Sequence, residues 1–125
     1  MLEHRNKVRK NLFFYLDVLD QENDRLLGQL GNISTKGMMI ISTTIIRPYQ
    51  QKEVLIQLPD MKEFEQKFIR VSLETRWARL HTDSHLHCVG CKFLSVTEEN
   101  LAAIRIVEKM LAFDSSISHG IEKTT

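Results

Sequence analysis

The chain of 125 residues is 42% hydrophobic and 26% charged, which is the composition of an ordinary globular domain. A chain of this length is expected to form one domain that buries about two-thirds of its unfolded surface. The best candidate for a membrane span, Leu12–Leu19, is too short and contains Asp17, and no cleavage site follows the charged residues 1–10. We therefore expect one cytoplasmic domain without a membrane partner.

The charge of the chain is distributed unevenly. Residues 1–10 contain four Lys or Arg and one Glu, whereas the formal net charge of the whole chain is only +1. A domain that binds duplex nucleic acid normally spreads basic charge over a face. The distribution therefore argues against nucleic acid and favours a small anionic ligand held by a basic N-terminal arm.

The first two predicted strands form a hairpin. Apolar residues alternate over residues 11–20, which places Leu12, Phe14, Leu16 and Val18 on one face of a strand. The polar residues 21–24 predict a turn. The apolar run that follows, Arg25–Leu30, is the returning strand.

A polar segment, Gly31–Gly37, separates this hairpin from the next apolar run. We expect it to be a loop whose two glycines supply positive φ angles and allow close approach to the backbone. Met38–Thr44 is predicted to be a third strand. Pro48 lacks a backbone donor, so the residues around it are excluded from a central strand.

Three further strands are predicted from alternation. Lys52–Leu58 alternates cleanly, and the longest alternation, Phe68–Trp77, predicts a half-buried antiparallel strand with His85–Leu94 as its partner. Trp77 ends the inward-facing row of the long strand. We therefore expect this ring to lie in the core and not to form a stacking surface.

A helix is predicted after the last strand. Ser95-Val96-Thr97-Glu98 has the spacing of a capping box, with a hydroxyl at the cap and Glu three residues on. From there to about Phe113, an apolar stripe recurs at helical spacing. The stripe consists of Leu101, Ile104, Val107 and Leu111.

These elements predict a mainly β fold. Roughly five to seven short strands and one final helix are typical of an antiparallel barrel, which leaves no exposed sheet edges, with the helix over one opening. Residues 114–125 are polar and lack periodicity. The chain is thus expected to divide into a basic arm (1–10), a barrel with its helix (11–113) and a flexible tail (114–125).

Two short patterns lie at separate places in the chain. Arg5 and Arg9 have the spacing Arg-x-x-x-Arg before the first strand. Asn32, Ser34 and Gly37 form Asn-x-Ser-x-x-Gly after the second strand. Either pattern alone is typical of a solvated terminus or of a polar turn.

Taken in this order, the two patterns resemble the motifs by which the PilZ family binds the bacterial second messenger cyclic di-GMP. The stretches Arg76–Arg79 and Val89–Phe93 also look like the family's Arg-Trp and Gly-x-x-Phe positions. The resemblance covers residues 3–113. It implies a six-stranded antiparallel PilZ-like barrel with a C-terminal α-helix, and a receptor for cyclic di-GMP that needs no cofactor.

The chemistry of the ligand suits the residues of both motifs. Guanine presents O6 and N7 as a pair of acceptors, which the planar forks of Arg5 and Arg9 can meet bidentately while also contacting phosphate. Asn32 and Ser34 can bind the polar edge of the other guanine, and Gly37 keeps the loop tight. We therefore expect these five residues to bind the ligand.

Two residues flank the arginines. His4 stands where many members of the family have another arginine, a position that is linked to whether one ligand or a stacked pair binds. The histidine leaves this stoichiometry open. Lys10 adds local positive charge but lacks a planar fork.

Cys88 and Cys91 form Cys-x-x-Cys, with three histidines nearby, at His81, His85 and His87. In a strand, residues three apart point to opposite faces, so the two thiols cannot converge on one metal ion. A redox pair would need a helix N-terminus. We expect neither a metal nor catalysis, because no nucleophile–base order or paired carboxylate is evident.

We therefore expect a non-catalytic receptor that signals to an unidentified effector protein by ordering its N-terminal arm. The first alternative is a PilZ-fold adaptor that binds protein partners and does not bind the ligand. The presence of both complete motifs argues against this alternative. A second is a small barrel that binds single-stranded nucleic acid, which would need a basic groove with exposed aromatics. A metal-dependent enzyme is the least favoured alternative.

Overall fold

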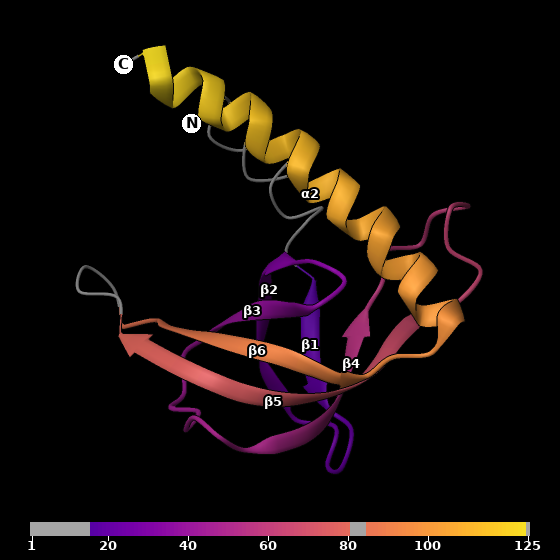
Figure 1. Cartoon of the computed structure of the whole chain (residues 1–125), viewed down its shortest axis with the longest axis vertical. Helices are drawn as coiled ribbons and strands as arrows, with labels where there is room; N and C mark the ends of the chain where they lie inside the picture. The colour runs from indigo at the N-terminus through magenta and orange to yellow at the C-terminus, as the bar shows by residue number, and fades with distance from the viewer. Residues whose placement is uncertain (1–15, 81–84, 125) are drawn as a thin grey trace.

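The computed structural model describes residues 16–80 and 85–124 (Figure 1). In chain order, the elements are β1 (Asp17–Asp20), β2 (Leu26–Ile33), β3 (Gly37–Ser42), β4 (Gln51–Gln57), β5 (Phe68–Leu80), β6 (His87–Ser95) and α2 (Glu98–Thr124). The strands close into a barrel in the order β1-β2-β3-β6-β5-β4, and every pairing is antiparallel. The predicted mainly β fold, a six-stranded antiparallel barrel with a C-terminal helix, is confirmed.

The core follows from the alternation of the strands. Ile69, Val71, Leu73 and Thr75 of β5 are all buried, as the period of two predicts. Val54 and Ile56 of β4 are fully buried in the same way, and the ends of β2 to β6 differ from the predicted ones by at most three residues. In the first strand, Leu16 and Val18 are buried as expected. Leu12 and Phe14 lie outside the described residues.

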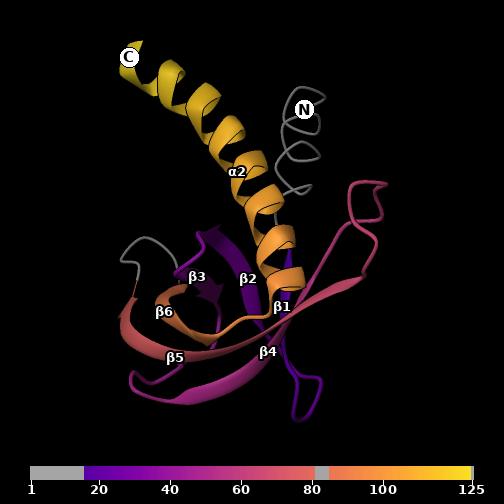
Figure 2. The ribbon, with the colours of Figure 1, turned by 45° about the vertical axis from the view of Figure 1, so that its right-hand side comes forward.

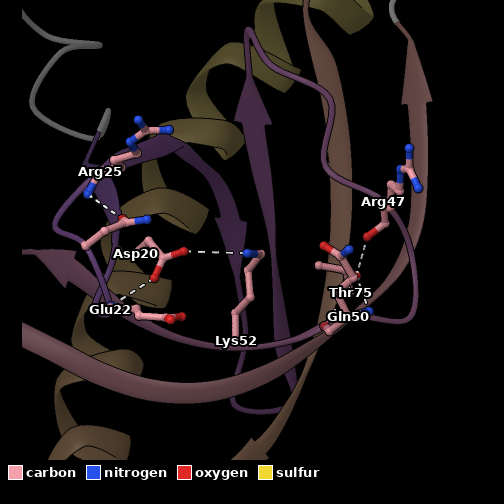
Figure 3. Close-up of polar contacts among 8 residues, drawn as sticks. Asp20, Glu22, Arg25, Arg47, Gln50, Lys52 and Thr75 are labelled. Carbon is pink, nitrogen blue, oxygen red and sulfur yellow. Dashed lines mark hydrogen bonds and ion pairs between the residues drawn. The ribbon is translucent and has the colours of Figure 1, made fainter.

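The predicted turn between the first two strands is present. Asp20 stabilises it, because its carboxylate accepts a hydrogen bond from the Glu22 backbone N–H at 2.9 Å and lies 3.5 Å from Lys52 Nζ (Figure 3). Asp24 has a φ of 59°, a left-handed conformation that Asp tolerates in turns. Asp20, the last residue of β1, therefore stabilises the turn that the polar residues 21–24 predicted.

The start of the helix differs from the prediction. Ser95 belongs to β6, where it pairs with Ser72, so it is not available as a helix cap. Thr97 is the cap instead: its hydroxyl accepts a hydrogen bond from the Asn100 N–H at 3.2 Å. The helix also continues to Thr124 and does not end near Phe113, so residues 114–124 are helical and not the predicted tail.

The first part of α2 packs on the barrel. Of the predicted stripe, Ile104 and Val107 are buried, whereas Leu101 and Leu111 are half-buried. Asn100 fixes the orientation, because it donates to the Arg70 carbonyl at 2.9 Å and accepts from Gln66 at 2.7 Å. The C-terminal part of the helix extends away from the barrel (Figures 1 and 2).

Thr75 holds the connection between β3 and β4, residues 43–50. Its buried hydroxyl donates to the Arg47 carbonyl at 2.7 Å and accepts from the Gln50 N–H at 2.9 Å (Figure 3). The Tyr49 N–H donates to the Thr75 carbonyl, and Tyr49 has a φ of 63°. A non-glycine residue in this region costs about 1–3 kcal/mol, which the hydrogen bonds of Thr75 must offset.

We predict that Thr75→Val lowers the free energy of unfolding by about 1–3 kcal/mol, because it leaves the Gln50 N–H and the Arg47 carbonyl without their partner. Urea denaturation measures the change. Thr43→Val, at an exposed position of the same connection, is the matched control and should change stability by less than about 0.5 kcal/mol. Equal effects of the two substitutions would show that Thr75 does not hold the connection.

Candidate functional site

Asn32 and Ser34 lie at the junction of β2 and β3. The segment between the strands is shorter than the predicted Gly31–Gly37 loop: β2 continues through Ile33, so Asn32 lies in a strand opposite Met39. The Ser34 N–H donates to the Gly37 carbonyl at 2.8 Å, and the Ser34 hydroxyl accepts from the Lys36 N–H at 3.2 Å. The turn is therefore fixed by its own hydrogen bonds.

Gly37 is needed for a different reason from the predicted one. No glycine of the described residues has a positive φ angle, so left-handed conformation is not its role. A Cβ at Gly37 would overlap the carbonyl oxygen of Cys91 on β6. The glycine therefore permits the close approach of β3 to β6; the sequence predicted a close approach to the glycine backbone without indicating which strand makes it.

A row of residues crosses the outer face of four strands. Asn32 pairs with Met39, Met39 with Gly90, and Gly90 with Trp77. The Trp77 ring lies directly over Gly90, where any Cβ would collide with it. The absence of a side chain at Gly90 is what lets the ring lie on the sheet.

The prediction that Trp77 lies in the core is wrong, because 43% of the residue is exposed. The register of β5 against β6 shifts between Thr75 and Trp77, which inserts Arg76 as an extra residue. Such a bulge reverses the alternation, so Thr75 points inward and Trp77 outward. Alternation in β5 alone could not reveal this, although Gly90 in the partner strand is a signal for close packing.

An outer cavity of about 510 Å³ lies along this row. Its lining includes Asn32, Ser34 and Gly37 together with Arg76, Trp77 and Lys92, and Lys92 is the cross-strand partner of Gly37. The volume lies within the range of small-molecule sites. An aromatic face, two cations, an amide and a hydroxyl together suit a planar, polar and anionic ligand.

The sequence interpretation assigned no ligand contact to Arg76, Trp77 or Lys92. The Arg79 guanidinium lies 5.5 Å from the centre of the Trp77 ring, within the range of a cation–π contact. The guanidinium lies over the ring, so a base that stacks on Trp77 must either displace Arg79 or stack on its guanidinium plane.

The arginine motif lies outside the described residues, as do His4 and Lys10. The described chain begins at Leu16, whose carbonyl accepts a hydrogen bond from the Leu30 N–H at 2.8 Å. Leu30 precedes Asn32 by two residues on β2. Leu16, the first described residue, therefore lies beside the strand that carries Asn32.

The two cysteines differ in environment. Val89 and Cys91 are buried, whereas Cys88 is half-buried. Burial raises the pKa of the Cys91 thiol to about 12, so the thiol stays protonated and is a poor metal ligand at neutral pH. In the described part of the chain, no three His, Cys, Asp or Glu side chains gather as they would around a metal ion. His81 lies outside that part.

A second polar cavity, of about 460 Å³, lies beside the turn between β1 and β2. It is lined by Asp20, Glu22, Lys52 and Glu53, together with Gln21 and Gln51. Its excess of carboxylates suits an anionic ligand poorly. None of the predicted site residues lines this cavity, so the outer cavity is the stronger candidate.

The described residues thus form a small barrel with a polar cavity on its outer face and a helix over one end. Comparison of the sequence with protein families matches residues 3–109 to the family described as PilZ domain. This chain therefore belongs to the PilZ domain family. A search of curated protein sequences gave no match.

Two solved structures share the fold. The inhibitor of motility of Bacillus subtilis (MotI/DgrA) is 16% identical, with a TM-score of 0.63 over 82% of this chain and 47% of that one. The chain thus spans about half the length of the B. subtilis protein. The PilZ domain of YcgR from Escherichia coli, solved with c-di-GMP, is 9% identical, with a TM-score of 0.56 over 87% of this chain and 88% of that one.

Across residues 16–80 and 85–124, no helix combines the length and the apolar character that crossing a membrane requires.

Proposed function

We propose that this chain is a non-catalytic receptor for cyclic di-GMP. The main support for this proposal is the outer cavity, whose lining combines Asn32 and Ser34 with an exposed aromatic ring and two cations. Membership of the PilZ family and the c-di-GMP named for the E. coli structure support it. Because this messenger acts inside bacteria, the proposal implies a bacterial cytoplasmic protein.

In the proposed complex, each part of the ligand has a chemical partner. One guanine stacks on Trp77, and its polar edge binds the amide of Asn32 and the hydroxyl of Ser34. Lys92 neutralises phosphate charge from β6. Arg5 and Arg9 meet the second guanine and the phosphates with their planar forks.

The signal is proposed to be the ordering of the N-terminal arm. Residues 1–10 contain only Met1, Leu2 and Val8 as apolar side chains, too few to offset a backbone entropy cost of roughly 1–2 kcal/mol per residue. Two bound phosphates neutralise the arm and give Arg5 and Arg9 partners. The arm then folds over the outer cavity and creates a new surface for an effector protein.

Calorimetric titration tests the ligand. Cyclic di-GMP should bind more tightly than GMP, because two linked guanines engage the arm and the outer cavity at the same time. Arg5→Ala and Arg9→Ala should each weaken binding by about 1–3 kcal/mol, the worth of a bidentate guanine contact.

Lys7→Ala is the matched control, since it removes one positive charge from the same arm without removing a planar fork. It should weaken binding less than either arginine substitution, and only through screened charge. Equal affinity for GMP and cyclic di-GMP would rule out the proposed ligand. An effect of Lys7→Ala as large as that of Arg9→Ala would show that the arm contributes only its net positive charge and makes no specific guanine contact.

Amide hydrogen exchange tests the mechanism. Residues 4–10 should exchange more slowly in the presence of cyclic di-GMP than without it, because binding fixes their backbone. The Arg9→Ala variant, measured at a ligand concentration that saturates it, should show less protection. An arm that is equally protected with and without ligand would refute the ordering mechanism while leaving the binding intact.

A further inference from the structure

The connection between β3 and β4 presents two large apolar side chains to solvent. Ile45 is 76% exposed and Tyr49 is 72% exposed, the highest values among the large hydrophobic residues of the described chain. Arg47 and Pro48 lie between them and are also exposed. Ile46, in contrast, is buried and anchors the connection to the core.

The conformation of this connection is fixed. Thr75 donates a hydrogen bond to the Arg47 carbonyl and accepts hydrogen bonds from the N–H groups of Tyr49 and Gln50. The Arg47 side chain points away from Thr75 (Figure 3). The backbone of Tyr49 is in the left-handed region, although its side chain stays exposed. A non-glycine residue in this region is strained, and strained backbone that is held by neighbouring contacts is concentrated at functional positions.

The strand next to the connection has a free edge. β4 pairs with β5 only from Phe68 to Glu74, whereas β6 pairs with β5 as far as Leu80. Among the described residues, no backbone hydrogen bond reaches the other edge of β5 from Arg76 to Leu80. All five residues of this end are exposed, and the arrowhead of β5 extends past the β3–β4 connection (Figure 1).

The charge of this region indicates what could cover it. The connection carries Arg47, the end of β5 carries Arg76 and Arg79, and neither segment contains Asp or Glu. The nearest carboxylate on β5, that of Glu74, lies 3.6 Å from Arg76. Pairing with the same edge of a second copy would set these arginines against each other, which is unfavourable.

We propose that the free edge of β5, from Arg76 to Leu80, binds an extended acidic and apolar segment of a partner protein as an added strand. The backbone of the edge supplies the hydrogen bonds, and Ile45 and Tyr49 supply apolar contacts beside it. Tyr and Arg are the residue types on which binding energy concentrates. A connection already held by Thr75 loses little freedom on binding.

This inference does not rest on the proposed receptor function. Its apolar contacts and Arg47 lie outside the outer cavity. Arg76 and Trp77 belong both to the cavity and to the β5 edge, so an added strand would lie next to the cavity.

Selection of random peptides displayed on phage against the full chain, without nucleotide, tests the proposal. Enriched peptides should combine Asp or Glu with apolar residues. Fluorescence polarisation with an enriched peptide should show binding at least about tenfold weaker for Ile45→Ser combined with Tyr49→Asn. Asn tolerates the left-handed backbone, so the connection should keep its conformation.

Two substitutions serve as matched controls. Leu26→Ser removes an exposed apolar side chain from β2 and should leave peptide binding unchanged. Arg47→Glu should weaken binding strongly, whereas Arg105→Glu, the same charge reversal at an exposed position of α2, should not. The bound peptide should also slow amide exchange between Arg76 and Leu80.

Several results would overturn the proposal. The first is enrichment of peptides that lack Asp and Glu. The second is amide exchange from Arg76 to Leu80 that does not change when peptide binds. The third is equal peptide affinity of the wild type and the Ile45→Ser and Tyr49→Asn variant. Sedimentation that shows self-association of the chain, lost in the Ile45→Ser and Tyr49→Asn variant, would assign the surface to a second copy instead.

Discussion

The short strand β1 pairs with two neighbours, and the architecture depends on this double pairing. Asp17 lies opposite Gln29 of β2, and Val18 lies opposite both Gly28 of β2 and Ile56 of β4. These contacts close the barrel and remove two edges that would otherwise be exposed. They also place Leu16, where the described chain begins, beside the strand of Asn32, because the Leu16 carbonyl accepts a hydrogen bond from the Leu30 N–H.

A single bulge in β5 determines what the outer face offers. Thr75 points inward and holds the β3–β4 connection, and the insertion of Arg76 turns Trp77 outward over Gly90. Without the insertion, alternation would place the indole inside the barrel and leave the outer cavity without its aromatic side. Beyond the bulge, β5 runs past β4, whose pairing with β5 stops at Glu74, and this leaves the free edge. The proposed ligand site and the proposed partner surface thus lie on the same part of β5.

Much of the barrel could be predicted, because a period of two is a local property of each strand. Val54, Ile56 and Ile69 are buried as their alternation predicts. The orientation of Trp77 could not be predicted in this way, because it depends on the register against β6. Ser95 failed as a cap for a similar reason: pairing with Ser72 keeps it in a strand. Asn32 and Ser34 do line one cavity, but the sequence did not reveal that Lys92 lines it with them.

The central claim is that cyclic di-GMP binds in the outer cavity, between the β2–β3 turn and Trp77. The most direct test is a titration of isotopically labelled protein with cyclic di-GMP, followed by heteronuclear NMR. Binding in this cavity should produce saturating shifts for the amides of Ser34 and Gly37 and for the indole N–H of Trp77, all with one dissociation constant. Shifts confined to the residues around Asp20 and Lys52, with the Trp77 indole unchanged, would contradict it.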